Sequence, residues 1–460
     1  MVFTTRQLQE KCREQHKDVF MVFVDLSKAF DTVKRDLLWD VLMRIGCPIK
    51  FVNILRQFHD GMTARVSIRG QESSPFPVCT GVRQGCVLAP MLFNIFLLCV
   101  TQLLHKGIEE NSGVTVEYRL DGNLFNIRRL HAKTKLHKVR ILEMQYADDC
   151  ALVSHSPQGL QSVLDAAVRA YSRMGLTINA AKTEVICQWS TNIPPTPPIF
   201  TVAGEKLSVV PSFRYLGSII SGDNSIDSEV QNRLNQASAA YGRLRRRVFQ
   251  NKNLNLNTKI SVYQAICITT LLYSCEAWVT YSRHIKSLEQ FNIRCLQRIL
   301  GITWRDRVPH TEILGRTGCK SIEATITRHQ LRWLGHVTRM PYNRLPRRVL
   351  YGQLHQGQRS AGGPKKRFKD QMKVALKKCK IKPGDLKNMA ADRNTWRQLC
   401  LDGTNTLEEE RTARRHQRRL RRNTPTPMTA SNTNTMYTCP TCNRACGSRI
   451  GLFSHQRTHR

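Results

Sequence analysis

The feature that most constrains this chain is Tyr146-Ala147-Asp148-Asp149, in which two adjacent carboxylates stand between two apolar runs. The flanking residues have the composition of strands and Asp accepts turn geometry, so the pattern predicts a β-hairpin with both acids at its turn. Taken alone, a solvated turn explains these residues better than a functional site does, because short motifs match by accident.

A second apolar run, residues 20–24, ends at Asp25 far upstream. It predicts a buried strand with its acid at the exit, where a sheet presents ligands. Carboxylates from two strand ends can hold two divalent cations about 3.5–4 Å apart. An oxygen-rich set of this kind suits Mg²⁺. Asp25, Asp148 and Asp149 are therefore the candidate catalytic residues and metal ligands.

These two segments resemble motifs of the reverse transcriptases of non-LTR (LINE-type) retrotransposons. Phe23-Val24-Asp25 with Lys28-Ala29-Phe30-Asp31 is similar to motif A of the family's palm, and Tyr146 to Asp149 is similar to motif C. The resemblance implies that Phe30 packs against the sugar of the incoming nucleotide and excludes a 2′-hydroxyl. From the pattern alone, Phe30 is a core residue.

Two further motifs follow in the family's order. The segment from Gly81 to Pro90 resembles motif B, in which Gln84 and the glycines Gly81 and Gly85 line the nucleotide and template pocket. Without the resemblance, two glycines before a helix are often just a turn. Lys182 stands where motif D has a lysine near the leaving pyrophosphate, and it is otherwise a surface residue between strands.

The last of these motifs sets the boundaries of the predicted domains. Phe213-Arg214-Tyr215-Leu216-Gly217 is similar to motif E, whose hairpin grips the primer end in the family through the positions of Tyr215, Leu216 and Gly217. The resemblance implies an α+β right-hand palm with partial fingers at 1–220. Helical spacing after Ser225 predicts an all-α thumb or connector at 221–345. Because fingers motifs precede the family's palm, the chain resembles an N-terminally truncated member.

The charge balance predicts a polyanionic partner. The chain carries 71 Lys and Arg residues against 34 Asp and Glu, a formal net charge of +37. Such an excess favours nucleic acid through counterion release. An anionic membrane is the competing partner, but the basic residues are spread along the chain, and the apolar run at 87–104 is interrupted by Pro90, Asn94 and Gln102. We therefore expect a buried helix there and no membrane partner.

Cysteine usage and the N-terminus predict the compartment. The sixteen cysteines are scattered singly apart from one C-terminal cluster, as is typical of reduced thiols and not of a disulfide framework. The first residues lack a signal pattern, so we expect a nuclear and/or cytoplasmic protein that is not secreted.

The C-terminal part divides into an extension and a finger. Residues 346–435 are basic and poorly apolar, which predicts a disordered or helical extension followed by a linker. The seven arginines of 411–422 are typical of a solvated segment and also fit nucleic-acid binding or nuclear import.

At 436–460, Cys439 and Cys442 are followed after twelve residues by His455 and then by His459. These ligand types and spacings predict a ββα zinc finger with one structural Zn²⁺. Cys446 could compete as a ligand, which is the less favoured alternative.

Together these features predict an RNA-directed DNA polymerase. By the resemblance, a primer 3′-hydroxyl attacks the α-phosphate of a deoxynucleoside triphosphate on an RNA template, with two Mg²⁺ ions at the aspartates. The expected partners are the RNA template, the DNA primer and deoxynucleoside triphosphates, with genomic DNA as a further candidate. The alternative is a non-catalytic remnant that binds nucleic acid through its basic surfaces and its finger.

Overall fold

The computed structural model describes residues 1–83, 85–108, 112–126, 130, 134–191, 196–357, 359, 364–423 and 437–459. It divides into two compact units, Met1–Glu409 and Glu410–Arg460. The first unit contains the predicted hairpin of carboxylates, and the second contains the cysteine and histidine cluster. The predicted linker at 424–435 and Gln84 lie outside the described residues.

A five-stranded sheet in the order β13-β10-β1-β9-β8 forms the centre of the first unit. Its middle strand β1 (Val19–Val24) pairs antiparallel with β9 (Asp149–Ser154) and β10 (Glu184–Gln188). The edges are β8 (Glu143–Tyr146) and the short β13 (Ser208–Val209). All six residues of β1 are buried, because both faces of the sheet are covered, and this explains the continuous apolar run in the sequence.

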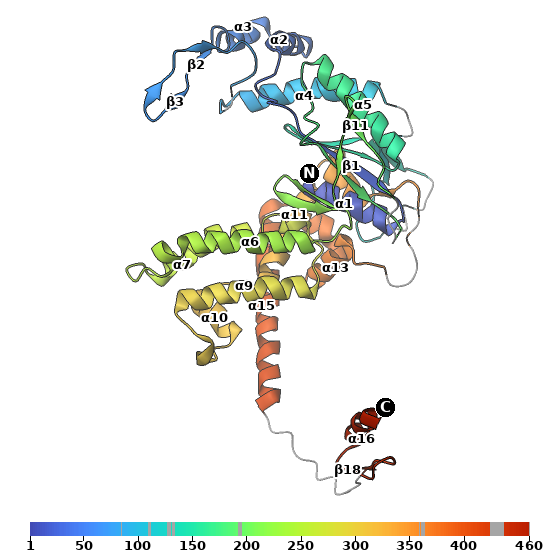
Figure 1. Ribbon diagram of the computed structural model, residues 1–460, viewed down its shortest axis with the longest axis vertical. Helices are drawn as coiled ribbons and strands as arrows, with labels where there is room; N and C mark the ends of the chain where they lie inside the picture. Colours follow the sequence, from blue (N-terminus) through green and yellow to red (C-terminus); the bar gives the residue numbers. More distant parts are fainter. Residues whose placement is uncertain are drawn as a thin grey trace. The chain divides into compact units, whose positions relative to one another are not determined.

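Alternate residues of β1 serve two different cores. Phe20, Val22 and Val24 pack in a cluster with the helices α2 (Arg35–Arg44), α4 (Ala89–Lys106) and α5 (Pro157–Arg173). Val19, Met21 and Phe23 face the opposite cluster, which includes Leu8 and Cys12 of α1 (Val2–Glu14). Figure 1 shows α4 and α5 running together against the sheet.

Helix α4 is the predicted buried helix at 87–104. By its length and composition α4 could cross a membrane, but core helices of soluble proteins can have the same length and composition. Its side chains Phe93, Phe96, Leu97 and Val100 pack in the same core as β1. The packing accounts for the apolar sequence of α4 without a bilayer.

Short helices and strands complete this region. Strand β6 (Val114–Tyr118) pairs antiparallel with β7 (His137–Ile141). The remaining elements are α3 (Ile49–Gln57), β2 (Thr63–Ala64), β3 (Ser67–Ile68), β4 (Gln71–Glu72), β5 (Phe76–Pro77), β11 (Thr201–Val202), β12 (Glu205–Lys206), β14 (Ser212–Tyr215) and β15 (Ser218–Ser221).

The segment after Ser225 is helical, as its spacing predicts, and its bounds as a separate domain stay a prediction. The helices are interrupted near Ser274, which lies in the left-handed region at φ 59°, and a short 3₁₀ turn follows. Its helices are α6 (Asp227–Leu244), α7 (Leu256–Val262), α8 (Thr269–Leu271), α9 (Ser282–Leu300), α10 (His310–Thr317) and α11 (Ile322–Arg339), with π-helical turns at Arg245–Phe249 and Tyr263–Ile268. As predicted, Gly301 ends α9 in the left-handed conformation, at φ 71°.

Of the two states predicted for the basic extension, the helical one is present in the described residues between 345 and 409, which belong to the first compact unit. Apolar side chains at helical spacing bury this segment against Leu331 and Leu334 of α11, namely Phe368, Met372, Leu376, Trp396 and Cys400. Its elements are α12 (Leu345–Tyr351), β16 (Gln353–Leu354), α13 (Phe368–Lys378), α14 (Leu386–Met389) and α15 (Arg393–Asn423). In addition, β16 pairs antiparallel with β6.

Trp396 fixes the start of α15 against α11. Its side chain is buried, and its indole N–H donates a hydrogen bond to the Leu331 carbonyl at 2.9 Å. The ring covers the backbone of Gly335, so a methyl group at position 335 would collide with it. Glycine is therefore required here by the close approach of two helices.

We expect Gly335→Ala to lower the free energy of unfolding of the full chain by about 1–3 kcal/mol or more, because the added methyl overpacks the Trp396 contact. Gly242→Ala is the matched control: Gly242 lies inside α6, and the position that an added Cβ would take has no neighbouring atom within 4 Å. Alanine there should be neutral or stabilise the chain by up to about 1 kcal/mol. Urea denaturation measures both, and equal stability of the two variants would contradict this account of the α11–α15 contact.

Candidate active site

The register of β1 and β9 brings the candidate catalytic acids to one edge of the sheet. Val24 pairs with Cys150, so Asp25 follows the last paired residue where Asp149 begins β9. Opposite residues of antiparallel strands have Cα atoms about 4.5–5.5 Å apart. Two acids that are 124 positions apart in the sequence are thus neighbours across the sheet.

The predicted hairpin turn is present and places Asp148 beside this pair. Tyr146 pairs with Asp149, which leaves Ala147 and Asp148 as the two turn residues. Ala147 lies in the left-handed region at φ 52°. A residue with a Cβ is strained there by about 1–3 kcal/mol, so the hydrogen-bonded strands must hold the turn in place.

The three aspartates form a negative site. The pKa of Asp149 is raised by burial and by the negative charges of Asp148 and Asp25. Lys182 partly balances them, with its Nζ 3.9 Å from Oδ2 of Asp25. Hard carboxylate oxygens that repel one another and retain a net negative charge are a donor set that fits a divalent cation such as Mg²⁺.

Lys182 reaches Asp25 because the loop before β10 is tied to the end of β1. The Asn179 N–H donates to the Asp25 carbonyl at 2.8 Å, and the Asp25 N–H donates to Thr183 Oγ1 at 3.3 Å. The lysine side chain is 71% exposed, so the ion pair itself adds little stability. The contact matters because it places a positive charge next to the three aspartates.

The segment that resembles motif B packs on the segment that resembles motif A. The Val82 N–H donates to the Phe30 carbonyl at 2.9 Å, and Gly81 has φ 85°. A Cβ at Gly81 would lie 2.7 Å from the backbone of Asp31, so no other residue fits there without movement. Gly85, at φ 83°, stands in open space.

Phe30 is half-buried, and its ring stacks on Phe93 of α4 with centroids 4.2 Å apart. One face of the Phe30 ring is therefore held by the core. Both the core interpretation and the proposed contact with a sugar are compatible with this position.

The hairpin β14–β15 is linked to the hairpin of the acids. The hydroxyl of Tyr215 donates to the Met144 carbonyl at 2.9 Å, and burial raises the pKa of Tyr215 far above its usual range, so the phenol stays protonated. Leu216 and Gly217 form the turn, with φ 48° and 75°. Positive φ at both central residues is typical of a type I′ turn.

Comparison with known proteins bears directly on this region. Residues 2–220 match the family model described as "Reverse transcriptase (RNA-dependent DNA polymerase)". The family matched is the reverse transcriptases. All the candidate polymerase residues, from Asp25 to Gly217, fall inside the match.

Relatives named as retrotransposon polymerases share this region. The "RNA-directed DNA polymerase from mobile element jockey" of Drosophila melanogaster is 23% identical over 63% of this chain and 29% of that protein. The "Retrovirus-related Pol polyprotein from type-2 retrotransposable element R2DM" of the same organism is 28% identical over 37% of this chain and 14% of that protein. The chain therefore spans less than a third of the length of these relatives.

Among solved structures, a telomerase from Candida albicans covers 72% of this chain and 50% of that chain, with 12% identity. Its TM-score of 0.25 is too low to establish a shared fold.

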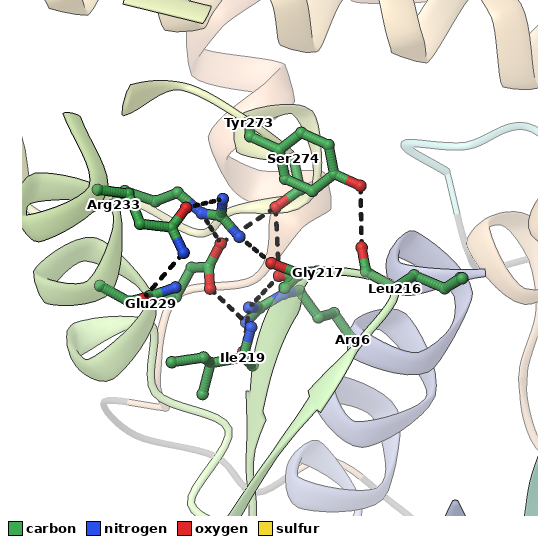
Figure 2. A network of polar contacts seen from close by, with 11 residues as sticks. Arg6, Leu216, Gly217, Ile219, Glu229, Arg233, Tyr273 and Ser274 are labelled. Atoms are coloured by element: carbon green, nitrogen blue, oxygen red, sulfur yellow. Dashed lines mark hydrogen bonds and ion pairs between the residues drawn. The ribbon is translucent and has the colours of Figure 1, made fainter. Parts of the chain in front are cut away.

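A buried ionic network holds the turn at Leu216–Gly217, near the end of the matched region (Figure 2). Glu229 and Arg233 of α6 form an ion pair at 2.7 Å, with side chains 0% and 5% exposed. Arg233 also donates to the Gly217 carbonyl, and Glu229 accepts from the Ile219 N–H at 2.6 Å. The turn is thus fixed by residues that lie beyond the matched region.

Two further segments join the same network. Arg6 of α1 donates to the Ile219 carbonyl at 2.7 Å, and the hydroxyl of Tyr273 donates to the Leu216 carbonyl at 2.8 Å. Burial lowers the pKa of Arg6 to about 10, so its guanidinium remains charged at neutral pH. The ring of the half-exposed Tyr273 also receives the Arg233 guanidinium, 4.7 Å from its centroid.

Sequence reasoning missed Arg6, Glu229, Arg233 and Tyr273. The i,i+4 spacing of Glu229 and Arg233 was visible, but such pairs are common on exposed helix faces. Nothing in the sequence shows that this pair is buried against a distant hairpin.

The second unit contains the other cluster of candidate ligands. Among the described residues, the one group of three or more His, Cys or acidic side chains with all ligand atoms within 4.8 Å of one another is Cys439, Cys442, His455 and His459. The three aspartates are not part of a group of this kind among the described residues.

Cys439 and Cys442 of the second cluster lie on a hairpin, His455 lies on a helix, and His459 lies in the 3₁₀ turn that follows the helix. The hairpin pairs β17 (Tyr437–Thr438) with β18 (Ala445–Cys446), and the helix is α16 (Arg449–Gln456), which is the predicted ββα order. Burial raises the pKa of the Cys439 thiol, but backbone hydrogen bonds from Thr441 and Cys442 outweigh this effect and lower it. A thiol that ionises readily suits a metal ligand.

We expect Arg233→Met to lower the free energy of unfolding by about 3–5 kcal/mol, because it leaves Glu229 buried without its partner. Arg316→Met is the matched control, since Arg316 and Glu312 form an i,i+4 pair whose side chains are 51% and 45% exposed. Loss of that pair should cost less than about 1 kcal/mol. Similar losses in both variants, measured by urea denaturation, would show that the network at the turn contributes no more than a surface pair.

Proposed function

We propose that this chain is an RNA-directed DNA polymerase of the non-LTR retrotransposon type, which extends a DNA primer with deoxynucleotides on an RNA template. The observation that carries the proposal is the β1–β9 register, which sets Asp25 beside Asp149 and Asp148 inside the region that matches reverse transcriptases. The jockey relative is named an RNA-directed DNA polymerase.

Asp25, Asp148 and Asp149 would hold divalent cations, with Mg²⁺ as the proposed ion. Bound there, two such ions would activate the primer 3′-hydroxyl and stabilise the charge on the leaving pyrophosphate. The chain's own contribution is to hold the three carboxylates at a rigid strand end and a tight turn, which fixes their spacing.

Other residues of the region have roles in this proposal. Lys182, next to Asp25, would place an ammonium near the leaving group and donate charge or a proton there. Phe30, backed by Phe93, would contact the sugar of the nucleotide, and Gly81 would let the backbone approach it. The turn Leu216–Gly217, linked through Tyr215 to the strand of the hairpin of acids, would hold the primer end.

The test is primer extension by the full chain on poly-rA/oligo-dT with Mg²⁺. Asp148→Ala should reduce incorporation by about a hundredfold or more, because it removes a ligand on which the reaction depends. Asp165→Ala, which removes an exposed carboxylate on α5, is the control and should retain activity. No incorporation by the wild type, together with retained nucleic-acid binding, would support the alternative of a non-catalytic remnant.

We further propose that Cys439, Cys442, His455 and His459 bind one structural Zn²⁺. The four ligand types and their mutual proximity support a tetrahedral site. The finger would give the chain a further contact with nucleic acid, including genomic DNA at an insertion site.

Metal analysis of the purified full chain tests the zinc proposal. We expect one zinc per chain in the wild type and less than about a tenth of that in Cys442→Ser, because three remaining ligands hold structural zinc poorly. Cys446→Ser is the matched control, since Cys446 lies outside the group of four. Loss of zinc from Cys446→Ser with retention by Cys442→Ser would assign the ligand to Cys446 instead.

A further inference from the structure

Helix α11 carries a row of basic side chains that have no role in the proposed polymerase site. Arg328, Arg332 and His336 recur every four residues and so lie along one side of the helix. Arg339 at the end of α11, Arg344 after it and Arg393 at the start of α15 extend the row. We call these six residues the cationic ledge.

The ledge has positive charges facing one another. The pKa of Arg328 is lowered by burial and by Arg332, and the pKa of His336 is lowered by burial and by Arg339, Arg393 and Arg344. Like charges at i,i+4 spacing destabilise a helix. The arrangement therefore does not serve the stability of α11.

Acidic side chains do not neutralise the ledge. Among the described residues, none of the five arginines takes part in a recorded ion pair. At the start of α11, Glu323 is engaged by Lys378 at 2.9 Å, and Glu408 interacts with Ser321. The positive charge of these arginines is therefore available to a negatively charged ligand.

Contacts within the fold hold Arg339 and Arg393 in position. Arg339 donates to the Ala390 carbonyl at 2.8 Å, and Trp396 locks the start of α15, with Arg393, beside α11. The buried Nε of Arg328 has no hydrogen-bond partner among the described residues. Side chains fixed before binding lose less conformational entropy when a ligand arrives.

The surface chemistry favours a polyanion over a protein partner. Between Ile322 and Arg339, a range described throughout, no large hydrophobic side chain is exposed. Protein interfaces usually depend on buried apolar or aromatic anchors, which this surface does not offer. Arginine forks bind phosphate oxygens in a bidentate manner.

We propose that the cationic ledge binds the phosphate backbone of a nucleic acid, as a second contact separate from the aspartate site. From Arg328 to His336 the helix rises about 12 Å, and phosphates of one duplex strand follow one another about every 3.4 Å along the axis. The ledge can thus contact several consecutive phosphates. The inference rests on the charges of α11 and α15 and does not require polymerase activity.

Binding of a fluorescent 20-nucleotide RNA, measured by anisotropy on the full chain in EDTA over a range of KCl, tests the proposal. The double variant Arg328→Gln with Arg332→Gln should bind about tenfold more weakly at 0.15 M salt, and the slope of log K against log salt should fall by about 1.4, or 0.7 for each phosphate contact. Circular dichroism and urea denaturation check that the variant is folded.

The matched control is Lys373→Gln with Lys377→Gln, which removes two exposed cations at the same spacing on α13. It should keep the affinity within about twofold and lower the slope far less. Equal weakening by both pairs would show only the effect of net charge and would overturn the proposal, as would no weakening by either. Loss of binding to poly-glutamate but not to RNA would assign the ledge to an acidic protein instead.

Primer extension separates this proposal from the proposed function. At saturating primer–template, the Arg328→Gln, Arg332→Gln variant should extend at the wild-type rate, because the aspartates are intact. If the wild type extends no primer but binds RNA more tightly than the ledge variant does, the proposed polymerase activity is refuted and the proposed RNA contact of the ledge is supported.

Discussion

The antiparallel pairing of β1 with β9 is the constraint on which the candidate site depends. A slip of one residue would turn every side chain of β1 to the other face of the sheet and would move Asp25 out of line with Asp149. Slippage is prevented because alternate residues of β1 are buried in two separate cores, one with α4 and α5 and one with α1. The apolar pattern of six residues therefore secures the geometry of three acids.

Helix α1 is also held by distant parts of the chain, through hydrogen bonds of its buried polar side chains. Arg6, Glu10 and Lys11 are buried, and each forms a hydrogen bond with a distant segment: the Ile219 carbonyl, the Phe368 N–H and the Gly352 carbonyl. Buried polar groups of this kind destabilise a fold strongly if one partner is lost. The helix consequently joins the sheet, the turn Leu216–Gly217 and the C-terminal helices into one unit.

Local patterns predicted much of this structure. The strand ending at Asp25, the hairpin at Asp148 and Asp149, the core helix at 89–106 and the ββα order at the C-terminus all follow from short-range spacing that the structure reproduces. The proximity of Asp25 to the pair was inferred from the two strand ends and supported by resemblance to a family. Spacing alone left a solvated turn as the better interpretation.

Long-range contacts account for what the sequence did not show. Residues 3–17 have the composition of an ordinary amphipathic helix, yet ten of the thirteen residues of α1 are buried, because partners made much later in the chain cover its polar face. The basic extension was expected to be disordered in part because its average composition is polar. A few well-spaced apolar residues, with Trp396 over Gly335, are enough to bury it.

The polar contacts of α1 also bear on how the protein is made. Lys11 and Glu10 precede their partners Gly352 and Phe368 by 341 and 358 positions. At a synthesis rate of about 5–20 residues per second, the helix leaves the ribosome roughly 20–70 s before those partners exist. Through that interval the charged side chains of Glu10 and Lys11 must stay hydrated, so α1 reaches its full set of hydrogen bonds only after the C-terminal helices have been made.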